Sequence, residues 1–309
     1  ISRKKTYEMK NKILVTGGSG MVGQSLRKIM PEAIYMSSKD CNLKNYDETL
    51  AFLEKHKPTT VIHIAGKVGG ILENLKYPVE FLEENIYINT NLCKAAHIAN
   101  VENLVAVLST CIYPDIVDTY PMKEEDMFNG APPIGNFQYA MSKRCLASQI
   151  EAYNKQYEKK WSCLIPCNLY GEYDKYEEHH SHFVSALIKK IHEAEDSIEL
   201  WGTGKPLRQF MYGGDLAKVI KYVIENDVVG NFNVAPKEVY TINEMAEIGI
   251  RSCNKEHLDI KYDNSKPDGQ YRKDVDSSKL LSILGNFQFT PLGDGIRRVY
   301  DNFSKRHDR

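Results

Sequence analysis

The sequence predicts an α/β protein with a doubly wound parallel sheet and a smaller, interleaved C-terminal lobe. Two observations lead to this prediction: short apolar runs alternate with helical stretches over the first half of the chain, and the alternation loosens after residue 170. Alternation of this kind is typical of βαβ units, which pair their strands in parallel. At 309 residues the chain is long enough for one large α/β unit with an appended lobe.

The first half of the chain shows its elements in a clear order. The expected elements are a strand over 12–16, a helix over 20–30, a strand over 33–36, a helix over 47–57, a strand over 60–64, a helix over 81–99, a strand over 104–108, a helix over 137–157 and a strand over 162–166. The strands are short and apolar, whereas the helices carry apolar residues at helical spacing. We therefore expect the strands to form one parallel sheet that the helices cover.

The second half has longer charged and aromatic loops between its elements. The expected elements are a helix over 183–194, a helix over 213–226, a strand over 231–234, a helix over 240–253, a strand over 258–263 and a helix over 291–304. We expect the strand at 231–234 to return to the first sheet. The predicted first domain is therefore 9–170, to which 205–235 return, and the predicted second lobe consists of 171–204 and 236–309.

The overall charge argues against two classes of partner. The chain has 40 basic and 41 acidic residues and no long block of one sign, which argues against nucleic acid and anionic membranes. No apolar run approaches the length of about 18 residues that a bilayer span needs, and residues 1–10 lack the apolar centre of a signal peptide. We therefore expect a cytoplasmic protein, in which residues 1–8, before Met9, form an extension.

The seven cysteines include no Cys-x-x-Cys pair. Their number and spacing fit neither a disulfide framework nor a usual zinc site. We expect no bound metal, and we expect most of the cysteines to be small buried core residues.

A glycine-rich turn joins the first expected strand to the first expected helix. The stretch ILVTGGSGMVGQSL has a G-x-x-G-x-x-G spacing. Glycines at these positions allow a tight turn and a close approach of the backbone to a pyrophosphate, which binds at the positive end of the helix. The sequence therefore predicts a Rossmann-type dinucleotide site. The residues expected to contact the dinucleotide here are Gly17, Gly18, Ser19, Gly20, Met21, Val22 and Gly23.

The end of the second expected strand indicates which dinucleotide binds. NAD sites normally offer a carboxylate there to the ribose 2′-hydroxyl. This chain has Ser38 and Lys39, whose hydroxyl and ammonium groups suit a 2′-phosphate instead. We predict NADP(H) as the cofactor, with Asp40 directed toward the adenine or the backbone rather than the ribose.

A tyrosine and a lysine lie four residues apart in the helix expected at 137–157. At this spacing Tyr139 and Lys143 share one helix face, so the ammonium is expected to lower the pKa of the phenol from its usual value of about 10. A phenol placed in this way can protonate a carbonyl oxygen as a hydride arrives. Ser109, at the end of the fourth expected strand, can donate a second hydrogen bond to the same oxygen. The three residues predict a carbonyl reductase site.

These features together resemble the extended short-chain dehydrogenase/reductase superfamily. Within it, STCIYP at 109–114, PCNLYGEYD at 166–174, WGTGKPLRQF at 201–210 and KPDGQYRK at 266–273 resemble the GDP-L-fucose synthase family. Members of that family epimerise carbons 3 and 5 of GDP-4-keto-6-deoxy-D-mannose and reduce carbon 4 with NADPH, usually as homodimers. The resemblance, which runs from about residue 12 to 304, implies an NADP-dependent multifunctional enzyme of GDP-L-fucose biosynthesis, both oxidoreductase and isomerase.

The resemblance also implies roles for individual residues. Ser109, Tyr139 and Lys143 would form the reductase triad, and Cys111 and His182 would form the epimerase pair. Further cofactor contacts are implied for Ala65, Gly66, Leu108, Tyr139, Lys143, Pro166, Cys167, Asn168, Leu169 and His182. Contacts with the GDP-sugar are implied for Ser109, Cys111, Asn168, Lys190, Trp201, Arg208, Asp268 and Lys273.

A thiol and an imidazole suit proton exchange beside a ketone. Hydrogens on the carbons that flank a ketone are acidic because the resulting anion spreads onto the oxygen. Cys111 can act as the base, since the usual thiol pKa of about 8.5 falls beside a cation, and His182 can act as the acid. His179 and His180 lie beside His182 in the segment EEHHSHF, and all three remain candidates. Cys111 could instead be a buried residue at a strand end, and Trp201 a core residue.

One loop departs from the family pattern and leaves other substrates open. Family members usually have Asp-Asn-Phe where this chain has Asp174-Lys175-Tyr176. The substrate could therefore be another GDP-4-keto sugar, such as a GDP-4-keto-6-deoxy-heptose of bacterial capsules, reduced at carbon 4 with or without epimerisation. A protein that senses NADP(H) without catalysis is a further alternative, against which the intact triad argues. A plain NAD-dependent 4-epimerase is disfavoured by Lys39 and Cys111.

Overall fold

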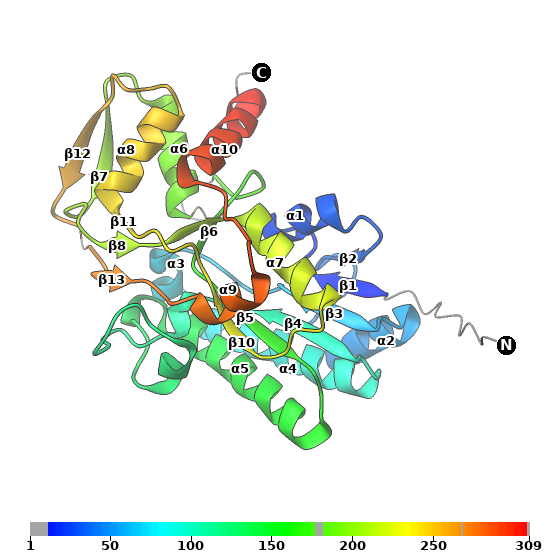
Figure 1. Cartoon of the computed structure of the whole chain (residues 1–309). Helices are drawn as coiled ribbons and strands as arrows, with labels where there is room; N and C mark the ends of the chain where they lie inside the picture. Colours follow the sequence, from blue (N-terminus) through cyan, green and yellow to red (C-terminus); the bar gives the residue numbers. More distant parts are fainter. Residues whose placement is uncertain (1–11, 177–181, 267, 308–309) are drawn as a thin grey trace.

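The computed structural model describes residues 12–176, 182–266 and 268–307 of the chain. A six-stranded sheet forms the centre of one part of the molecule, and a second part with smaller sheets lies beside it (Figure 1). The extension expected at residues 1–8, and two of the candidate histidines, His179 and His180, lie outside the described residues.

The central sheet is parallel throughout, as predicted. Its strands are β1 (Ile13–Thr16), β2 (Ile34–Met36), β3 (Thr60–His63), β4 (Asn103–Val107), β5 (Ser162–Pro166) and β10 (Asn231–Val234). The strand order is β10-β5-β4-β3-β1-β2, so the order reverses beside β1. Ligands of such sheets bind at the carboxyl ends of the strands near this reversal. Parallel pairing of β10 with β5 confirms that the strand at 231–234 returns to the first sheet.

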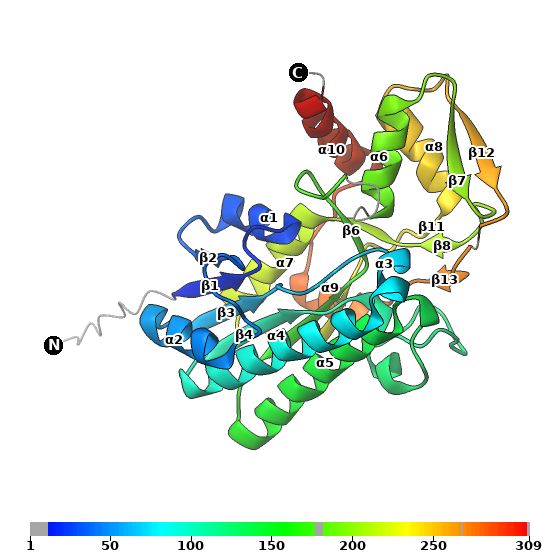
Figure 2. The same ribbon diagram turned by 180° about the vertical axis from the view of Figure 1, so that it is seen from behind.

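Helices cover both faces of this sheet. They are α1 (Met21–Ile29), α2 (Tyr46–His56), α4 (Pro78–Ile98), α5 (Phe137–Tyr157) and α7 (Gly213–Glu225). α1 packs against α7 on one face, and α4 packs against both α2 and α5 on the other, which faces the viewer in Figure 2. The short helix α3 (Ile71–Lys76), which the sequence pattern did not predict, precedes α4.

Side-chain caps explain where two of the helices begin. Asn45 precedes α2, and its side chain accepts hydrogen bonds from the backbone amides of Asp47 and Glu48. Thr241 and Glu244 form a capping box at the start of α8 (Ile242–Ser252). Such caps satisfy backbone amides that have no partner within the helix.

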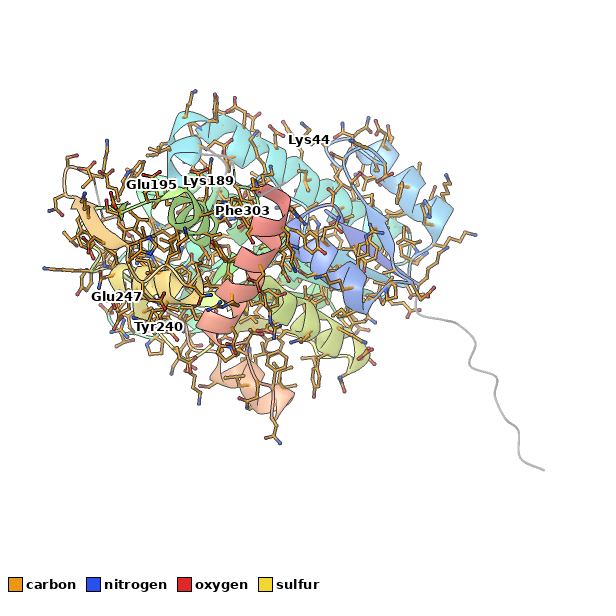
Figure 3. All side chains as sticks on the ribbon, turned by 90° about the horizontal axis from the view of Figure 1, so that it is seen from above. Lys44, Lys189, Glu195, Tyr240, Glu247 and Phe303 are labelled. Atoms are coloured by element: carbon orange, nitrogen blue, oxygen red, sulfur yellow. The ribbon has the colours of Figure 1, made fainter. Side chains whose placement is uncertain are left out.

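The second part contains three helices around an apolar cluster. The helices are α6 (Phe183–Glu193), α8 and α10 (Leu292–His307). They bury Ile188, Met245 and Phe303 in a core separate from that of the central sheet. Figure 3 shows these helices from above, with Lys189 labelled on α6, Glu247 on α8 and Phe303 on α10.

In the described residues, the remaining strands form three small sheets. They are β6 (Asn168–Tyr170) with β9 (Phe210–Tyr212), β7 (Ser197–Trp201) with β12 (Asp259–Asp263), and β8 (Leu207–Arg208) with β11 (Tyr240–Thr241) and β13 (Arg272–Lys273). Helix α9 (Ser278–Leu284) lies in the predicted lobe 236–309, yet Leu280 and Leu284 pack into the core of the central sheet. The division into domains at the predicted residues stays a prediction.

The cysteines are mostly core residues, as expected. Five are buried, namely Cys41, Cys93, Cys163, Cys167 and Cys253. Cys145 is exposed, and Cys111 is partly exposed. Among the described residues, no helix combines the length and the apolar composition that a bilayer crossing requires.

Candidate functional site

The glycine turn between β1 and α1 forms a cradle in which Gly17, Gly18 and Gly23 leave no room for a Cβ. Gly17 has a φ of +71°, and a Cβ there would lie 3.0 Å from the Cα of Ala65. A Cβ on Gly23 would lie 2.7 Å from the carbonyl oxygen of Gly17, closer than real Cβ atoms approach. Gly20 caps α1 without a side-chain hydrogen bond, so the first amides of the helix can bind phosphate oxygens. The cradle thus fits the pyrophosphate of a dinucleotide.

The end of β2 presents hydroxyl and ammonium groups to solvent. Ser38 and Lys39 are exposed directly after the strand. The Asp40 carboxylate accepts hydrogen bonds from the Ser37 hydroxyl at 2.7 Å and the Ser37 amide at 2.8 Å, which lower its pKa. This arrangement confirms that Asp40 is directed to the backbone. The Lys39 ammonium and the Ser38 hydroxyl are therefore the groups that would bind a 2′-phosphate.

The remaining residues predicted to contact the cofactor follow the carboxyl ends of neighbouring strands. Ala65 and Gly66 follow β3, Leu108 follows β4, and Pro166 ends β5. The Ala65 amide donates to the Thr16 hydroxyl at 3.2 Å, which ties the loop after β3 to the glycine cradle. Asn168 and Leu169 lie in β6, where the Asn168 amide group donates to the carbonyl of Gln209 at 2.9 Å.

Tyr139 and Lys143 lie in α5 beside the end of β4. The Lys143 ammonium donates to the carbonyl of Val107 at 2.9 Å and lies 5.9 Å from the centre of the Tyr139 ring. Burial lowers the pKa of Lys143 to about 8. Burial, with a smaller contribution from Cys111, raises the pKa of Tyr139. The prediction that the pKa of Tyr139 is lowered is therefore wrong. Burial removes the phenol from water and raises its pKa, and the Lys143 ammonium donates its hydrogen bond to the Val107 carbonyl. The phenol stays protonated at neutral pH.

The sulfur of Cys111 lies in a polar cluster at the end of β4. Cys111 belongs to the short helix η1 (Thr110–Ile112), and its backbone amide donates to the Ser109 hydroxyl at 3.3 Å. Its Sγ accepts hydrogen bonds from Asn136 at 2.8 Å and from the Lys273 ammonium at 3.1 Å. Burial by itself would raise the pKa of the thiol, but Lys273 and the hydrogen bonds of Ser109 and Asn136 lower it below its usual value. The sulfur is thus a candidate base rather than a core atom.

His182 lies at the N-cap of α6, with its ring against a carboxylate. Its Nδ1 lies 3.0 Å and 3.2 Å from the two oxygens of Asp174. The hydrogen bond with Asp174 raises the pKa of the imidazole although burial opposes this, and the charge of Cys111 raises it further. His182 is thus a candidate acid, and the Asp174 side chain that holds it is only 5% exposed.

Arg208 and Lys273, from the second part of the chain, both interact with Cys111. The Arg208 guanidinium donates to the carbonyls of Gln270 at 2.5 Å and Leu207 at 2.8 Å. Gln270 in turn donates to the carbonyl of Asp115 at 3.0 Å, which joins the loop before β13 to the loop after η1. Lys273, which is also expected to hold the GDP-sugar, donates a hydrogen bond to the sulfur of Cys111.

Three other residues predicted to hold the substrate are accessible. Lys190 is exposed on α6 and donates to the carbonyl of Glu199 at 2.7 Å. Asp268 accepts hydrogen bonds from the amide and hydroxyl of Thr203 at 2.6 Å and 2.8 Å. Trp201 is 51% exposed at the end of β7, which rules out the alternative that it is a core residue.

Sequence analysis missed two partners of the candidate catalytic residues. Asn136 ends the short helix η3 (Ile134–Asn136), directly before α5, and contacts Cys111. Asp174 was recognised only as part of a divergent loop, whereas it pairs with His182. Neither residue belongs to a periodic pattern, because Asn136 ends a helix of only three residues and Asp174 lies in a loop. The path of both segments depends on the whole fold. Only the position of Asn136 directly before the expected helix 137–157 could have drawn attention to that residue.

The chain is similar to several known proteins over most of its length. The model of the NAD dependent epimerase/dehydratase family matches residues 13–235. The GDP-L-fucose synthase of Dictyostelium discoideum is 39% identical over 305 residues and the alignment covers 93% of each chain. The GDP-L-colitose synthase of Yersinia pseudotuberculosis is 37% identical over 303 residues, with 94% of this chain and 97% of the other covered. The crystal structure of a GDP-L-fucose synthetase from Naegleria fowleri bound to NADP is 30% identical, with a TM-score of 0.87 and coverage of 97% and 94%.

Proposed function

Because the chain belongs to the NAD dependent epimerase/dehydratase family, alongside GDP-L-fucose synthases, we propose that it is an NADP-dependent epimerase/reductase that forms GDP-L-fucose. It epimerises carbons 3 and 5 of a GDP-4-keto-6-deoxy sugar and reduces carbon 4. The observation that carries this proposal is the polar cluster around the Cys111 sulfur, 3.1 Å from Lys273 and 2.8 Å from Asn136. A thiol whose pKa is lowered suits the removal of a proton, a step that epimerisation requires and that reduction of carbon 4 does not.

The dinucleotide site supports the cofactor assignment. NADPH supplies the hydride that carbon 4 receives. The amides at the start of α1 would bind its pyrophosphate, and Ser38 and Lys39 would bind its 2′-phosphate. An enzyme with this site and with intact Ser109, Tyr139 and Lys143 is a catalyst rather than a sensor of NADP(H).

Epimerisation begins with the removal of a proton beside the ketone. The Cys111 thiolate, which Lys273 favours, takes the proton from carbon 3 or carbon 5. The resulting negative charge spreads onto the ketone oxygen, where hydrogen bonds from Ser109 and Tyr139 stabilise it. The His182 imidazolium then returns a proton to the opposite face of the carbon. Solvent resets the pair by removing a proton from the thiol and supplying one to the imidazole.

Reduction uses the same oxygen and the same phenol. As carbon 4 is reduced, Tyr139 transfers its phenolic proton to the ketone oxygen, which becomes the hydroxyl of the product. The phenol carries this proton at neutral pH because burial raises its pKa. Lys143, on the same helix face, stabilises the phenolate that forms until solvent restores the proton.

A second candidate function is the conversion of another GDP-4-keto sugar. Two observations favour it: the relative from Yersinia pseudotuberculosis is a GDP-L-colitose synthase, and Lys175 and Tyr176 depart from the family pattern in the loop after β6. In this case the catalytic residues keep their roles and only the sugar pocket differs. A GDP-4-keto-6-deoxy-heptose is included in this class.

We also propose that the enzyme is a homodimer that works in the cytoplasm. The resemblance to the GDP-L-fucose synthase family supports the dimer, because its members usually form one. Light scattering of the purified protein measures the assembly directly, and a monomer of 35.3 kDa would contradict it.

Product analysis by NMR tests the proposed function. With GDP-4-keto-6-deoxy-D-mannose and NADPH in deuterated water, we expect NADPH oxidation and GDP-L-fucose that carries deuterium at carbons 3 and 5. NADPH oxidation only with another GDP-4-keto sugar would favour the second candidate. Reduction without any deuterium at these carbons would contradict epimerisation.

A further inference from the structure

We propose that Asp174 is a positioning residue that fixes the His182 imidazole with its Nε2 proton directed to the sugar. The inference rests on the proposed function, because it deepens the proton return step of epimerisation. It assigns a function to a residue in the loop where the chain departs from the family pattern.

The contact between the two side chains fixes which ring nitrogen is engaged. Nδ1 of His182 lies 3.0 Å from one oxygen of Asp174 and 3.2 Å from the other. An ionised carboxylate can only accept hydrogen bonds, so Nδ1 must carry a proton. In the imidazolium the second proton lies on Nε2, on the opposite side of the ring from Asp174. That proton is the one available for transfer.

Two further donors hold the carboxylate in place. The hydroxyl of Ser185 donates to Asp174 at 2.5 Å and the backbone amide of Lys175 donates at 2.9 Å. Ser185 is fully buried in the first turn of α6, the same helix that His182 caps. Hydrogen bonds to a charged acceptor are among the strong ones and offset the cost of burying it. The carboxylate is therefore fixed relative to the start of α6.

The charges around His182 favour the protonated imidazole. Asp174 raises the pKa of the ring most, burial opposes it, Cys111 raises it as well, and Lys175 lowers it. The site therefore contains two pairs of charged groups. In one, the Lys273 cation stabilises the thiolate of Cys111, and in the other the Asp174 anion stabilises the imidazolium of His182. The first pair favours the base and the second favours the acid, which is what proton exchange across a sugar carbon requires.

Nitrogen NMR of the wild-type protein without substrate provides the first test. At a pH where His182 is neutral, the nitrogen shifts should show the tautomer with its proton on Nδ1 and a bare Nε2. The resonances are assigned by their loss in His182→Gln. A proton on Nε2 of the neutral ring would overturn the proposal, and this test needs neither sugar nor an altered Asp174.

The Asp174→Asn variant provides the second test. Removing the charge should lower the pKa of His182 by about 1–3 units. Since the acid is the protonated form, the alkaline limb of deuterium entry at carbons 3 and 5 should move to lower pH. At a pH above the pKa of His182 in both proteins, the rate of deuterium entry in the variant should be about tenfold lower for each unit by which the pKa falls. An unchanged pKa of His182 would overturn the proposal.

Asp215→Asn is the matched control for a merely structural effect. Asp215 is a buried carboxylate that accepts from the Thr290 amide at 2.6 Å and the Lys218 ammonium at 2.9 Å. Its loss should reduce thermal stability without moving the pKa of His182 or the pH limbs. The two proposals can fail independently. An unexpected NMR result for His182 would not change the outcome of the product analysis, and specificity for a different sugar would not change the titration of His182.

Discussion

The ammonium of Lys273 lies 3.1 Å from the sulfur of Cys111, although 162 residues separate them in the chain. Lys273 comes from β13, a two-residue strand, and Cys111 follows the central strand β4. The candidate base therefore forms where the two parts of the chain meet. A cation at this distance favours the thiolate over the thiol.

Replacing Lys273 by Met should raise the pKa of Cys111 by about 1–3 units, because the nearby positive charge is lost. The ultraviolet absorbance of the thiolate, followed against pH and corrected with a Cys111→Ser protein, measures this directly. Deuterium entry should fall at neutral pH and recover as the pH is raised. Lys261→Met, at an exposed position on β12, is the control. Equal thiol pKa values in both variants would contradict the role of Lys273.

Replacing Tyr139 by Phe should reduce hydride transfer by about 10²–10⁴-fold, because no other group donates a proton to the ketone oxygen as carbon 4 is reduced. Stopped-flow absorbance of NADPH measures the step, and fluorescence titration should give nearly unchanged NADPH affinity. In the wild-type protein, the raised pKa of Tyr139 also means that this phenol does not titrate near neutral pH. A fully active Phe variant would exclude Tyr139 as the proton donor.

Replacing Gly23 by Ala should strongly weaken NADPH binding. The added Cβ would lie 2.7 Å from the carbonyl oxygen of Gly17, so the turn that receives the pyrophosphate must shift. Gly70→Ala is the control, because a Cβ there has no atom within 4 Å. Calorimetric titration with NADPH compares the two proteins. Equal affinity for NADPH in both would count against the cradle as the pyrophosphate site.

Buried His63 should make stability depend on pH. Its Nδ1 lies 2.9 Å from the hydroxyl of Thr16 and its Nε2 lies 2.9 Å from Oδ1 of Asn89. Burial, and then the charge of Lys143, lowers its pKa to about 3. The folded state thus binds this proton less readily than the unfolded state, whose histidine has a pKa of about 6.5. The contribution of His63 is complete above that value and is lost as the pH falls toward 3.

The His63→Asn variant isolates this contribution. Between the two pKa values, the free energy of unfolding of the wild-type protein should lose up to about 1.4 kcal/mol per pH unit relative to the variant. Denaturant unfolding at a series of pH values gives the comparison. His257→Asn, at an exposed position, should keep the wild-type slope. If the free energy of unfolding changed with pH at the same slope in all three proteins, the result would contradict a neutral, buried His63.

The sequence predicted the elements around the central sheet because their signals are local. The apolar run at Ser162–Pro166 and the amphipathic stretch at Phe137–Tyr157 were both assigned with the bounds that the structure has. The strands β8, β11 and β13 were missed, since each has two residues and is defined by its partners rather than by a pattern. Helix α3 is six residues long, too short for a clear period.

The candidate site was predictable in its residue types and not in its electrostatics. The spacing of Tyr139 from Lys143 and the end of the fourth expected strand identified Tyr139 and Ser109, and the family resemblance identified Cys111. These residues do lie near the end of β4. The predicted direction of the pKa of Tyr139 was wrong, because the spacing of two residues along a helix does not reveal how deeply the pair is buried. The contacts of Asn136 with Cys111 and of Asp174 with His182 depend on the path of each segment through the whole fold, which the local sequence does not reveal.

The most direct measurement is the rate of deuterium entry at carbons 3 and 5 of GDP-4-keto-6-deoxy-D-mannose in Cys111→Ser, followed by NMR in deuterated water. The account predicts a decrease of about 10²–10⁴-fold relative to the wild-type protein, the size expected for a lost acid or base. Reduction of carbon 4 should persist, because Tyr139 and Lys143 are intact. Deuterium entry at the wild-type rate would show that Cys111 is not the base and would contradict the epimerase half of the proposed function.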